Sequence, residues 1–450
     1  MNNASIAKGH PPWPSEVQKL VQEKQEHAYS ILAAKLGLGS DPAKAYVKLS
    51  VPQMPLSKVS WQEFAKQFGI KLTSEEEENL RELVQAQFGH YFTEPPTPYE
   101  DSNRYVVMAM ILDEVLAAFA ALGKSFEPKP IVATLPSGRL NAIVKCEDRT
   151  QTPIIFLEQG LFQFLYDFAL AVGWALPAFS AKELADDKSL AQHRGPHTLP
   201  FGGGPFPDVL YSYVVSGSPI TGGTPVPKPP HNVLLCERLV NQMSRFVIAH
   251  ELSHFALGHY DPNNKTESWD KEYHADAHAL LVLSQAAQRE GQSRAFTFWA
   301  CDLCLLCLDL LDRGMGVLTF GSTPSWVSPS HPSSYSRSRR LREILEYAHV
   351  THAGSALLLH LVKRAAAWLG FGSASTFEFP VSSLTEPEMI LMSQITDDGY
   401  SATAELGGMS YAIISKLWEF GSFPFLLAHQ KGKRPSPIWN DRIATSFKLQ

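Results

Sequence analysis

The sequence predicts an α+β protein that is predominantly helical, with a small mixed sheet upstream of one motif-bearing helix. Apolar residues recur at helical spacing through most of the chain. Between residues 130 and 157 this period gives way to short β-type runs separated by turn residues. The 450 residues are 44% hydrophobic and 19% charged, which is typical of a globular protein with sizeable cores. The net charge of -6 gives no electrostatic reason to expect a nucleic-acid partner.

The first hundred residues predict an N-terminal helical region. Its expected elements are helices at Pro14–Leu36, Trp61–Phe68 and Ser74–Phe88 and a strand at Tyr46–Val51. Ser74, with Glu77 three residues on, is the expected N-cap of the third helix. The Pro-rich stretch Thr93–Asp101 predicts a linker or long loop, after which we expect a second domain over residues 101–350.

That second region begins with a strongly helical stretch, Tyr105–Leu122, and then changes period. The expected strands are Pro130–Leu135, Asn141–Lys145 and Pro153–Leu157, followed by a helix at Gly160–Leu176. The segment from His193 to Pro230 is rich in Gly and Pro, so we expect a surface loop or a lid there.

The chemistry-bearing motif is His250-Glu251-Leu252-Ser253-His254, a His-Glu-x-x-His sequence in a predicted helix. In an α-helix the two histidines lie one turn apart on one face, so both imidazoles can bind one tetrahedral ion. Glu251 lies beside them, where a carboxylate can take a proton from water. Gly258 is the expected end of this helix, and His259 is interpreted as a helix-end residue.

A third protein ligand is needed to complete such a site. The preferred candidate is Glu272 on a second predicted helix, Trp269–Gln288, because Asp276 shares its face and can accept a hydrogen bond from a ligand histidine. His274, His278 and Glu267 stay open as alternatives.

This arrangement resembles the gluzincins, zinc peptidases that take two ligands from His-Glu-x-x-His and a Glu from a later helix. The spacing of Glu272 and Asp276 is similar to that in thermolysin-like and HtpX-like peptidases. The two helices also resemble the phage-exclusion protease Lit and related bacterial intracellular peptidases. The resemblance covers Leu239–Leu283 and implies a zincin-like core, with Zn²⁺ held by two histidines and a glutamate. It also implies an edge strand that pairs with substrate, for which Pro153–Leu157 or Asn141–Lys145 is the candidate.

Downstream, Ser330-His331-Pro332 precedes a basic helix start and resembles the His-Pro element of HtpX-like peptidases. The resemblance implies that His331 stabilises the oxyanion formed on the scissile carbonyl, with Tyr335 as a lesser candidate. Arg337 or Arg340 would then orient the carboxylates or the substrate. After residue 350 we expect a C-terminal helical region, 351–450, that carries no recognisable motif.

Five cysteines, three of them clustered at Cys301, Cys304 and Cys307, fit reduced thiols on a buried helix better than disulfides or a cluster site. The N-terminus lacks a signal-peptide pattern, and acids such as Asp113 and Asp302 interrupt the apolar helices, so we expect neither export nor a membrane partner. The expected protein is therefore a cytoplasmic zinc endopeptidase that acts on a protein or peptide substrate. The alternatives are a zinc-stabilised sensor or scaffold with this fold and a membrane-embedded peptidase.

Overall fold

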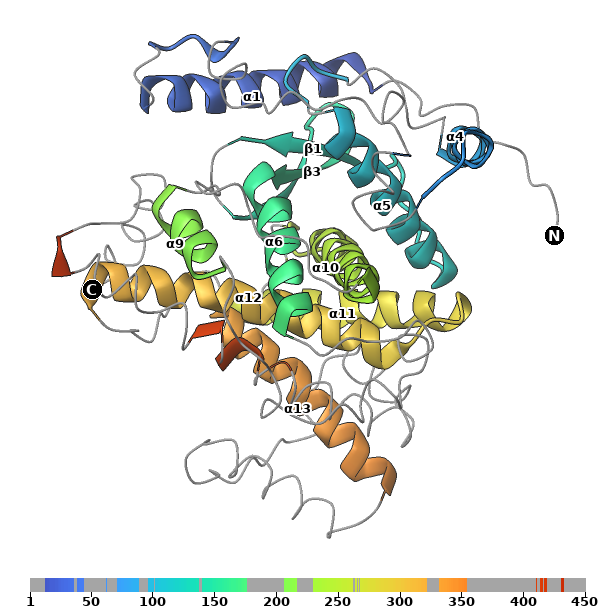
Figure 1. Ribbon diagram of the computed structural model, residues 1–450, viewed down its shortest axis with the longest axis vertical. Helices are drawn as coiled ribbons and strands as arrows, with labels where there is room; N and C mark the ends of the chain where they lie inside the picture. Colours follow the sequence, from blue (N-terminus) through green and yellow to red (C-terminus); the bar gives the residue numbers. More distant parts are fainter. Residues whose placement is uncertain are drawn as a thin grey trace. The chain divides into compact units, whose positions relative to one another are not determined.

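The computed structural model describes the helices and strands named below and their adjoining turns (Figure 1). The described residues are 13–35, 39–43, 62, 71–88, 96–100, 102–136, 140–175, 206–216, 230–261, 264, 266, 268–321, 332–353, 410, 413–415, 417–418 and 430–432. The chain divides into two compact units, residues 1–163 and 164–450, and the division falls within one helix. The expected boundaries near residues 100 and 350 stay a prediction.

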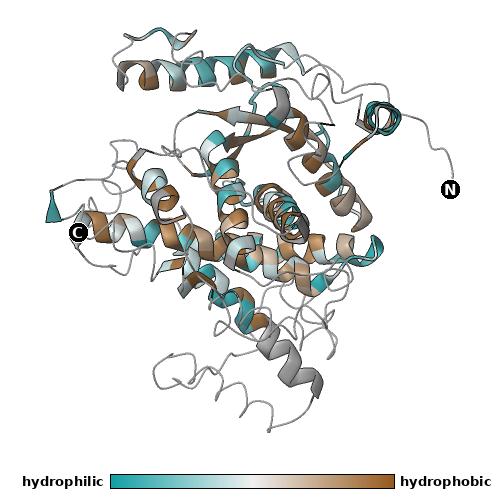
Figure 2. Cartoon of the chain, viewed as in Figure 1, coloured by the Kyte–Doolittle hydropathy of each residue, from teal (hydrophilic) through white to brown (hydrophobic). Residues whose placement is uncertain are grey.

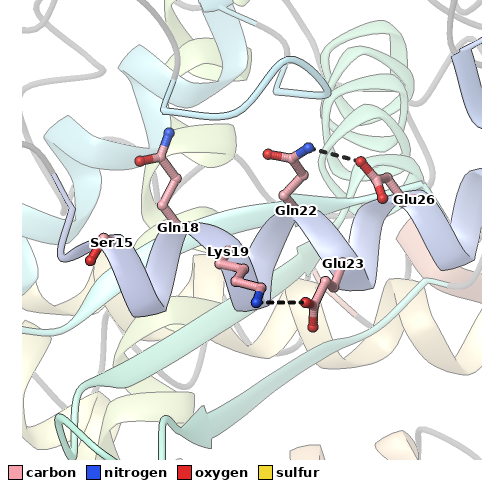
Figure 3. A pocket seen from close by; sticks show the side chains of 6 residues that line it. All are labelled: Ser15, Gln18, Lys19, Gln22, Glu23 and Glu26. Atoms are coloured by element: carbon pink, nitrogen blue, oxygen red, sulfur yellow. Dashed lines mark hydrogen bonds and ion pairs between the residues drawn. The ribbon is translucent and has the colours of Figure 1, made fainter.

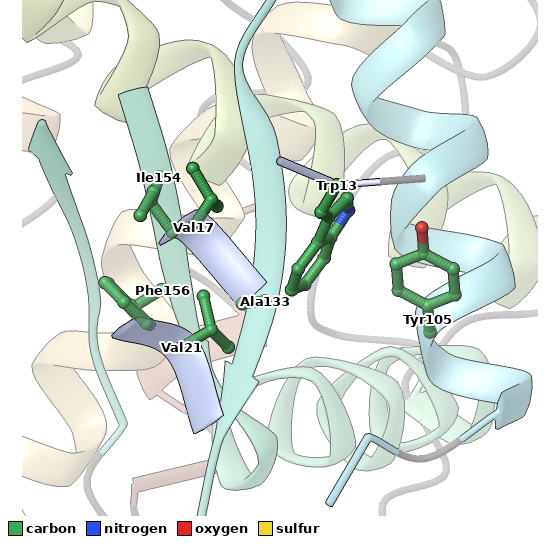
Figure 4. Packing of buried hydrophobic residues seen from close by; sticks show 7 residues of the cluster. All are labelled: Trp13, Val17, Val21, Tyr105, Ala133, Ile154 and Phe156. Carbon is green, nitrogen blue, oxygen red and sulfur yellow. The ribbon is translucent and has the colours of Figure 1, made fainter. Parts of the chain in front are cut away.

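The first unit combines three helices with a sheet of three described strands. Its helices are α1 (Ser15–Lys35), α4 (Ser74–Phe88) and α5 (Ser102–Ala121), and its strands are β1 (Ile131–Leu135), β2 (Ala142–Cys146) and β3 (Pro153–Glu158). Both α1 and α5 pack against β1. Figure 4 shows the apolar cluster that joins them, in which Trp13 packs edge-on against Tyr105 while Val17 and Val21 face Ile154 and Phe156.

The strand order is β1-β3-β2, with β3 parallel to β1 and antiparallel to β2. All six residues of β3 are buried, as expected of a central strand, whereas β2 is largely exposed. The proposal of Pro153–Leu157 as a substrate-pairing edge is therefore wrong, because both of its sides are already hydrogen-bonded within the sheet. Asn141–Lys145 corresponds to β2, which is an edge among the described strands.

The second unit contains a packed group of helices. These are α9 (Phe206–Ser216), α10 (Pro230–Ala256), α11 (Ser268–Arg289), α12 (Arg294–Phe320) and α13 (Ser334–Ala353), while α6 (Gln159–Ala175) spans the division between the units. Helix α10 packs on both α11 and α12, and α13 packs on α11 and α12. Figure 1 shows α10 almost end-on beside them.

Apolar residues explain why these helices form one core. Helix α12 has 21 buried residues, and Figure 2 shows hydrophobic colour along much of α6, α10 and α12, whereas α4 is mostly hydrophilic. Among the described residues no helix is both long and apolar enough to cross a membrane. The predominantly helical fold with a small mixed sheet agrees with the sequence prediction.

Most predicted elements appear close to their expected bounds, with two exceptions. The segment 193–230 is not loop throughout, because α9 forms inside it with Val209, Leu210 and Tyr213 fully buried. The N-cap of α4 is Thr73 and not the expected Ser74. The hydroxyl of Thr73 accepts from the backbone N–H of Glu76 at 3.2 Å, and the carboxylate of Glu76 accepts from the backbone N–H of Thr73 at 2.7 Å. The expected strand at Tyr46–Val51, the expected helix at Trp61–Phe68 apart from residue 62, and most of the elements expected after residue 353 lie outside the described residues.

Candidate metal centre

The motif helix ends as the sequence predicts, at a left-handed glycine. Gly258 has φ +66°, and its N–H donates to the carbonyl of Phe255 at 3.0 Å. The N–H of His259 donates to the carbonyl of His254 at 2.9 Å. This pair of bonds is a Schellman motif, which satisfies carbonyls at the helix end and turns the chain toward α11.

Three donor groups from α10 and α11 converge behind this turn. Nε2 of His250 lies 3.0 Å from Nε2 of His254. One carboxylate oxygen of Glu272 lies 3.5 Å from the first of these nitrogens, and the other oxygen lies 3.4 Å from the second. All three residues are buried, and one ligand atom of each lies within 4.8 Å of the others. This group could bind a metal ion.

The alternative third ligands lie differently. Nδ1 of His278 lies 3.1 Å from the hydroxyl of Ser253, which itself donates to the carbonyl of Ala249 at 2.7 Å. The ring of His274 packs near His259, with ring centroids 5.9 Å apart. Glu267 lies outside the described residues. Among the residues that the structure describes, only Glu272 joins the two motif histidines as a group able to hold a metal ion.

A second layer of charged groups surrounds these donors. Asp276, one turn after Glu272 on α11, places a carboxylate oxygen 2.9 Å from Nδ1 of His250. Arg337 on α13 donates to both oxygens of Asp276, at 2.6 and 2.7 Å, and lies 3.3 Å from Glu272. The expected role of Arg337, orienting the carboxylates, agrees with these contacts, while Arg340 instead lies over the ring of Tyr273 at 6.0 Å.

The charges within this cluster are strongly coupled. Burial would raise the pKa of Glu272, but its hydrogen bond with His250 and the charge of Arg337 outweigh burial and lower it, so this carboxylate is ionised. Burial, reinforced by His250, lowers the pKa of His254 to about 2, which leaves its ring neutral. Burial and Arg337 lower the pKa of His250, but Asp276 and Glu272 outweigh both and raise it to about 9. Side chains bind metal ions as an ionised carboxylate or a neutral imidazole. Glu272 and His254 are already in these states, whereas His250 would have to release its proton when an ion binds.

The contact that the sequence interpretation missed belongs to His259. This residue is not a simple helix-end histidine, because it is only 6% exposed and its Nδ1 lies 2.9 Å from Nδ1 of His254. The signal was present in the sequence. In a Schellman motif the residue after the left-handed glycine contacts the residue five positions earlier, which here is His254.

The structure describes only some of the other predicted site residues. Glu251 is buried on α10, next in sequence to His250, at 8% exposure. Tyr335 is half-buried in the first turn of α13. His331 lies outside the described residues. The five cysteines are free thiols, of which Cys301, Cys304 and Cys307 are buried on α12, as expected.

A hollow of about 390 Å³ lies along α1 in the first unit (Figure 3). Its lining side chains form two pairs along the helix. Lys19 pairs with Glu23 at 4.0 Å, and Gln22 donates to Glu26 at 2.8 Å. Pairs of this kind, one exposed and one partly buried, are ordinary for a solvated helix face, so this hollow offers no catalytic chemistry.

Comparison with known proteins gives one family match. Searches of the curated proteins and of the solved structures found no match. A model of the Peptidase U49 family matches residues 224–357, a region that includes α10, α11, α12 and α13 and every described residue of the metal centre. This match supports the assignment of a peptidase, and hence a hydrolase, to this region of the chain.

Proposed function

We propose that the chain is a zinc-dependent endopeptidase that hydrolyses peptide bonds of an intracellular protein substrate. His250, His254 and Glu272 would hold the zinc ion, and Glu251 would act as general base. The observation that carries the proposal is the convergence of these three buried donors inside the region that matches a peptidase family.

The donor set fits zinc in both chemistry and spacing. Zinc prefers imidazole nitrogen and carboxylate oxygen, and two donors bound at about 2.0–2.1 Å in tetrahedral geometry lie about 3.3 Å apart. The separations of 3.0, 3.4 and 3.5 Å between the donors here are close to that value. Both carboxylate oxygens of Glu272 face the imidazoles, so the group can bind through either.

The number of donors favours a catalytic site over a structural one. Structural zinc sites are closed by four protein ligands, whereas catalytic sites use three and keep one position for solvent or substrate. Among the described residues the group contains three ligands. His259 is not part of this group, because it faces Nδ1 of His254, whereas the side of His254 that faces His250 and Glu272 carries Nε2.

Each candidate side chain would have a distinct task in the proposed reaction. When bound, zinc would polarise the scissile carbonyl and lower the pKa of a water molecule from 15.7 to about 7. Glu251 would accept a proton from the attacking water and pass it to the leaving amine. Asp276, held by Arg337, would fix the ring of His250. His331 or Tyr335 would donate a hydrogen bond to the oxyanion.

Replacing Glu251 by Gln tests the enzyme against the sensor or scaffold alternative. The amide cannot accept the proton, so the variant should keep zinc and lose turnover by at least about 10²-fold. Metal content by mass spectrometry and cleavage of casein or a peptide library, with zinc and with chelator, measure the two properties separately. The matched control is Glu237→Gln, an exposed glutamate on the same helix, which should cleave like the parent.

Three results would count against the proposal. Full cleavage by Glu251→Gln would remove Glu251 from the mechanism. Zinc binding without any cleavage by the parent protein would favour a zinc-stabilised sensor or scaffold with this fold. A Glu272→Ala variant that retains stoichiometric zinc would show that the ion is held elsewhere.

A further inference from the structure

The two motif histidines have different partners at the ring nitrogen that faces away from the donor group. Nδ1 of His250 faces a carboxylate oxygen of Asp276 at 2.9 Å. Nδ1 of His254 faces Nδ1 of His259 at 2.9 Å. The aspartate is the usual companion of a metal-binding histidine, whereas an imidazole in this place is not part of the proposed mechanism.

The contact between the two imidazoles limits the positions that a proton can take to two alternatives. Two ring nitrogens at hydrogen-bond distance share one proton, because two lone pairs repel and two N–H groups clash. If His259 were the donor, neutral His254 would carry its own proton on Nε2, in the middle of the donor group. If His254 is the donor, its Nε2 offers a lone pair toward His250 and Glu272, which lie 3.0 and 3.4 Å away.

The backbone keeps the ring of His259 in place by several independent contacts. Its own N–H donates to the carbonyl of His254 at 2.9 Å, and its carbonyl accepts from Nζ of Lys271 on α11 at 3.0 Å. The preceding carbonyl, that of Gly258, accepts from the side-chain amide of Asn264 at 3.0 Å. These bonds join both ends of the α10–α11 turn, so the imidazole is held by the same turn that brings Glu272 to the histidines.

We propose that His259 is a positioning residue for His254: its Nδ1 accepts the Nδ1–H of His254 and so aims the Nε2 lone pair of His254 at the metal position. The assignment rests on the proposed function, because it presumes that His254 binds the ion through Nε2. His259 itself touches neither the ion nor the substrate in this role. It makes the ligand pair unequal, since one imidazole is supported by a carboxylate and the other by a neutral acceptor.

Three substitutions of His259 separate positioning from simple packing. His259→Ala removes the acceptor. His259→Asn places an amide oxygen close to the position of Nδ1, whereas His259→Gln places it close to the position of Nε2. The measurements are zinc affinity by competition with a chromophoric chelator and the visible absorption spectrum of the cobalt-substituted protein, neither of which depends on turnover. The matched control is His274→Asn, since His274 lies beside His259 and outside the donor group.

The expected result is a loss of about 10–100-fold in zinc affinity for His259→Ala and His259→Gln, the usual cost of removing such a partner. His259→Asn should recover most of that loss and restore the parent cobalt spectrum, and His274→Asn should match the parent throughout. If His259→Ala fails to fold, the comparison of the Asn and Gln variants decides the question alone.

Two outcomes would contradict what is proposed, and each overturns a different part of it. Equal zinc affinity in the parent and the Ala variant, or equal loss in the Asn and Gln variants, overturns the assignment of His259 while the zinc site stands. A parent protein that binds no zinc at all overturns the proposed function itself.

Discussion

At the scale of single residues, Arg337 is the side chain that makes two neighbouring buried carboxylates compatible with folding. Glu272 and Asp276 lie one turn apart on α11 and are 6% and 1% exposed. Arg337 contacts both, and the planar guanidinium matches the two oxygens of Asp276 at 2.6 and 2.7 Å. The proposed metal centre therefore depends on a third helix that supplies no metal ligand.

Replacing Arg337 by Gln should destabilise the zinc-free protein by about 3–5 kcal/mol, because two buried carboxylates lose the guanidinium and keep only His250 as a cationic partner. Urea denaturation of chelator-treated protein measures the free energy of unfolding. Added zinc should restore part of the loss, since the ion supplies positive charge to the same acids. The control is Arg339→Gln on the same helix, whose pair with Glu343 is half-exposed and should change stability by less than about 1 kcal/mol. Equal effects of the two substitutions would contradict this account.

The donor residues were predictable from sequence because their spacing is local. His250 and His254 share a face of one helix, and Glu272 and Asp276 share a face of the next. The role of His259 was missed because the residue was interpreted only as a helix-end histidine, without the contact back to His254 that a Schellman motif implies. The side chains that come from further away, such as Arg337, could be proposed only by resemblance, since their approach depends on how α13 packs.

At the scale of elements, the ends of α12 follow local capping rules, whereas its interior depends on tertiary packing. Ser293 caps α12 by accepting from the N–H of Phe296, and Gly321 ends it at φ +75°. The sequence predicted a buried helix around Cys301, Cys304 and Cys307, and the observed helix continues through Gly314 and Gly316 to Phe320. Both glycines are buried within the helix, so tertiary packing outweighs their low helix propensity, a cost of about 1 kcal/mol each.

Helix α9 is the opposite case, a helix that forms inside a segment predicted to be a loop. Its sequence, Phe206–Ser216, is apolar enough to bury several side chains, and the hydroxyl of Tyr213 donates to Asp167 of α6 at 2.8 Å. The surrounding Gly and Pro residues indicated a loop. A window confined to residues 206–216 would have favoured a helix, so the error came from averaging composition over too long a segment.

Asp309 on α12 makes a pH-dependent contribution to stability. Burial is the main cause that raises the pKa of Asp309 from its ordinary value of 3.8 to about 6, although Arg313 opposes it. The folded state then binds more protons than the unfolded state between these two pH values, so this group's contribution to stability falls as pH rises from about 4 to 6. The Asp309→Asn variant should not show that fall. The unfolding free energy of the variant minus that of the parent should therefore be about 2–3 kcal/mol larger at pH 7 than at pH 4. Urea denaturation at both pH values measures this, and a constant difference would contradict it.

At the scale of the whole molecule, the balance of helices and strands was predictable but the pairing of strands was not. Each strand could be located because its alternation and its turns are local. The order β1-β3-β2 depends on contacts between residues far apart in sequence, which is why the buried strand β3 was wrongly considered as an edge.

The distribution of thiols gives a test of the folded state as a whole. Cys146 is exposed, whereas Cys236, Cys301, Cys304 and Cys307 are buried. Burial also raises the pKa of Cys236 to about 12, which disfavours its reactive thiolate. Native protein should therefore react rapidly with a thiol reagent such as dithionitrobenzoate at one of its five cysteines, and denatured protein at all five. Rapid reaction of several thiols in the native protein would contradict the packing of α12.

The chain order of the helices around the metal centre has a consequence for biosynthesis. The histidines and Glu272 leave the ribosome well before α13, whose Arg337 faces Glu272 and Asp276. A nascent chain that ends in α12 thus carries the three donors and an extra negative charge without the arginine that later balances it. The complete electrostatic arrangement arises only after translation has passed residue 337, so a metal ion captured earlier would enter a centre that still lacks its arginine.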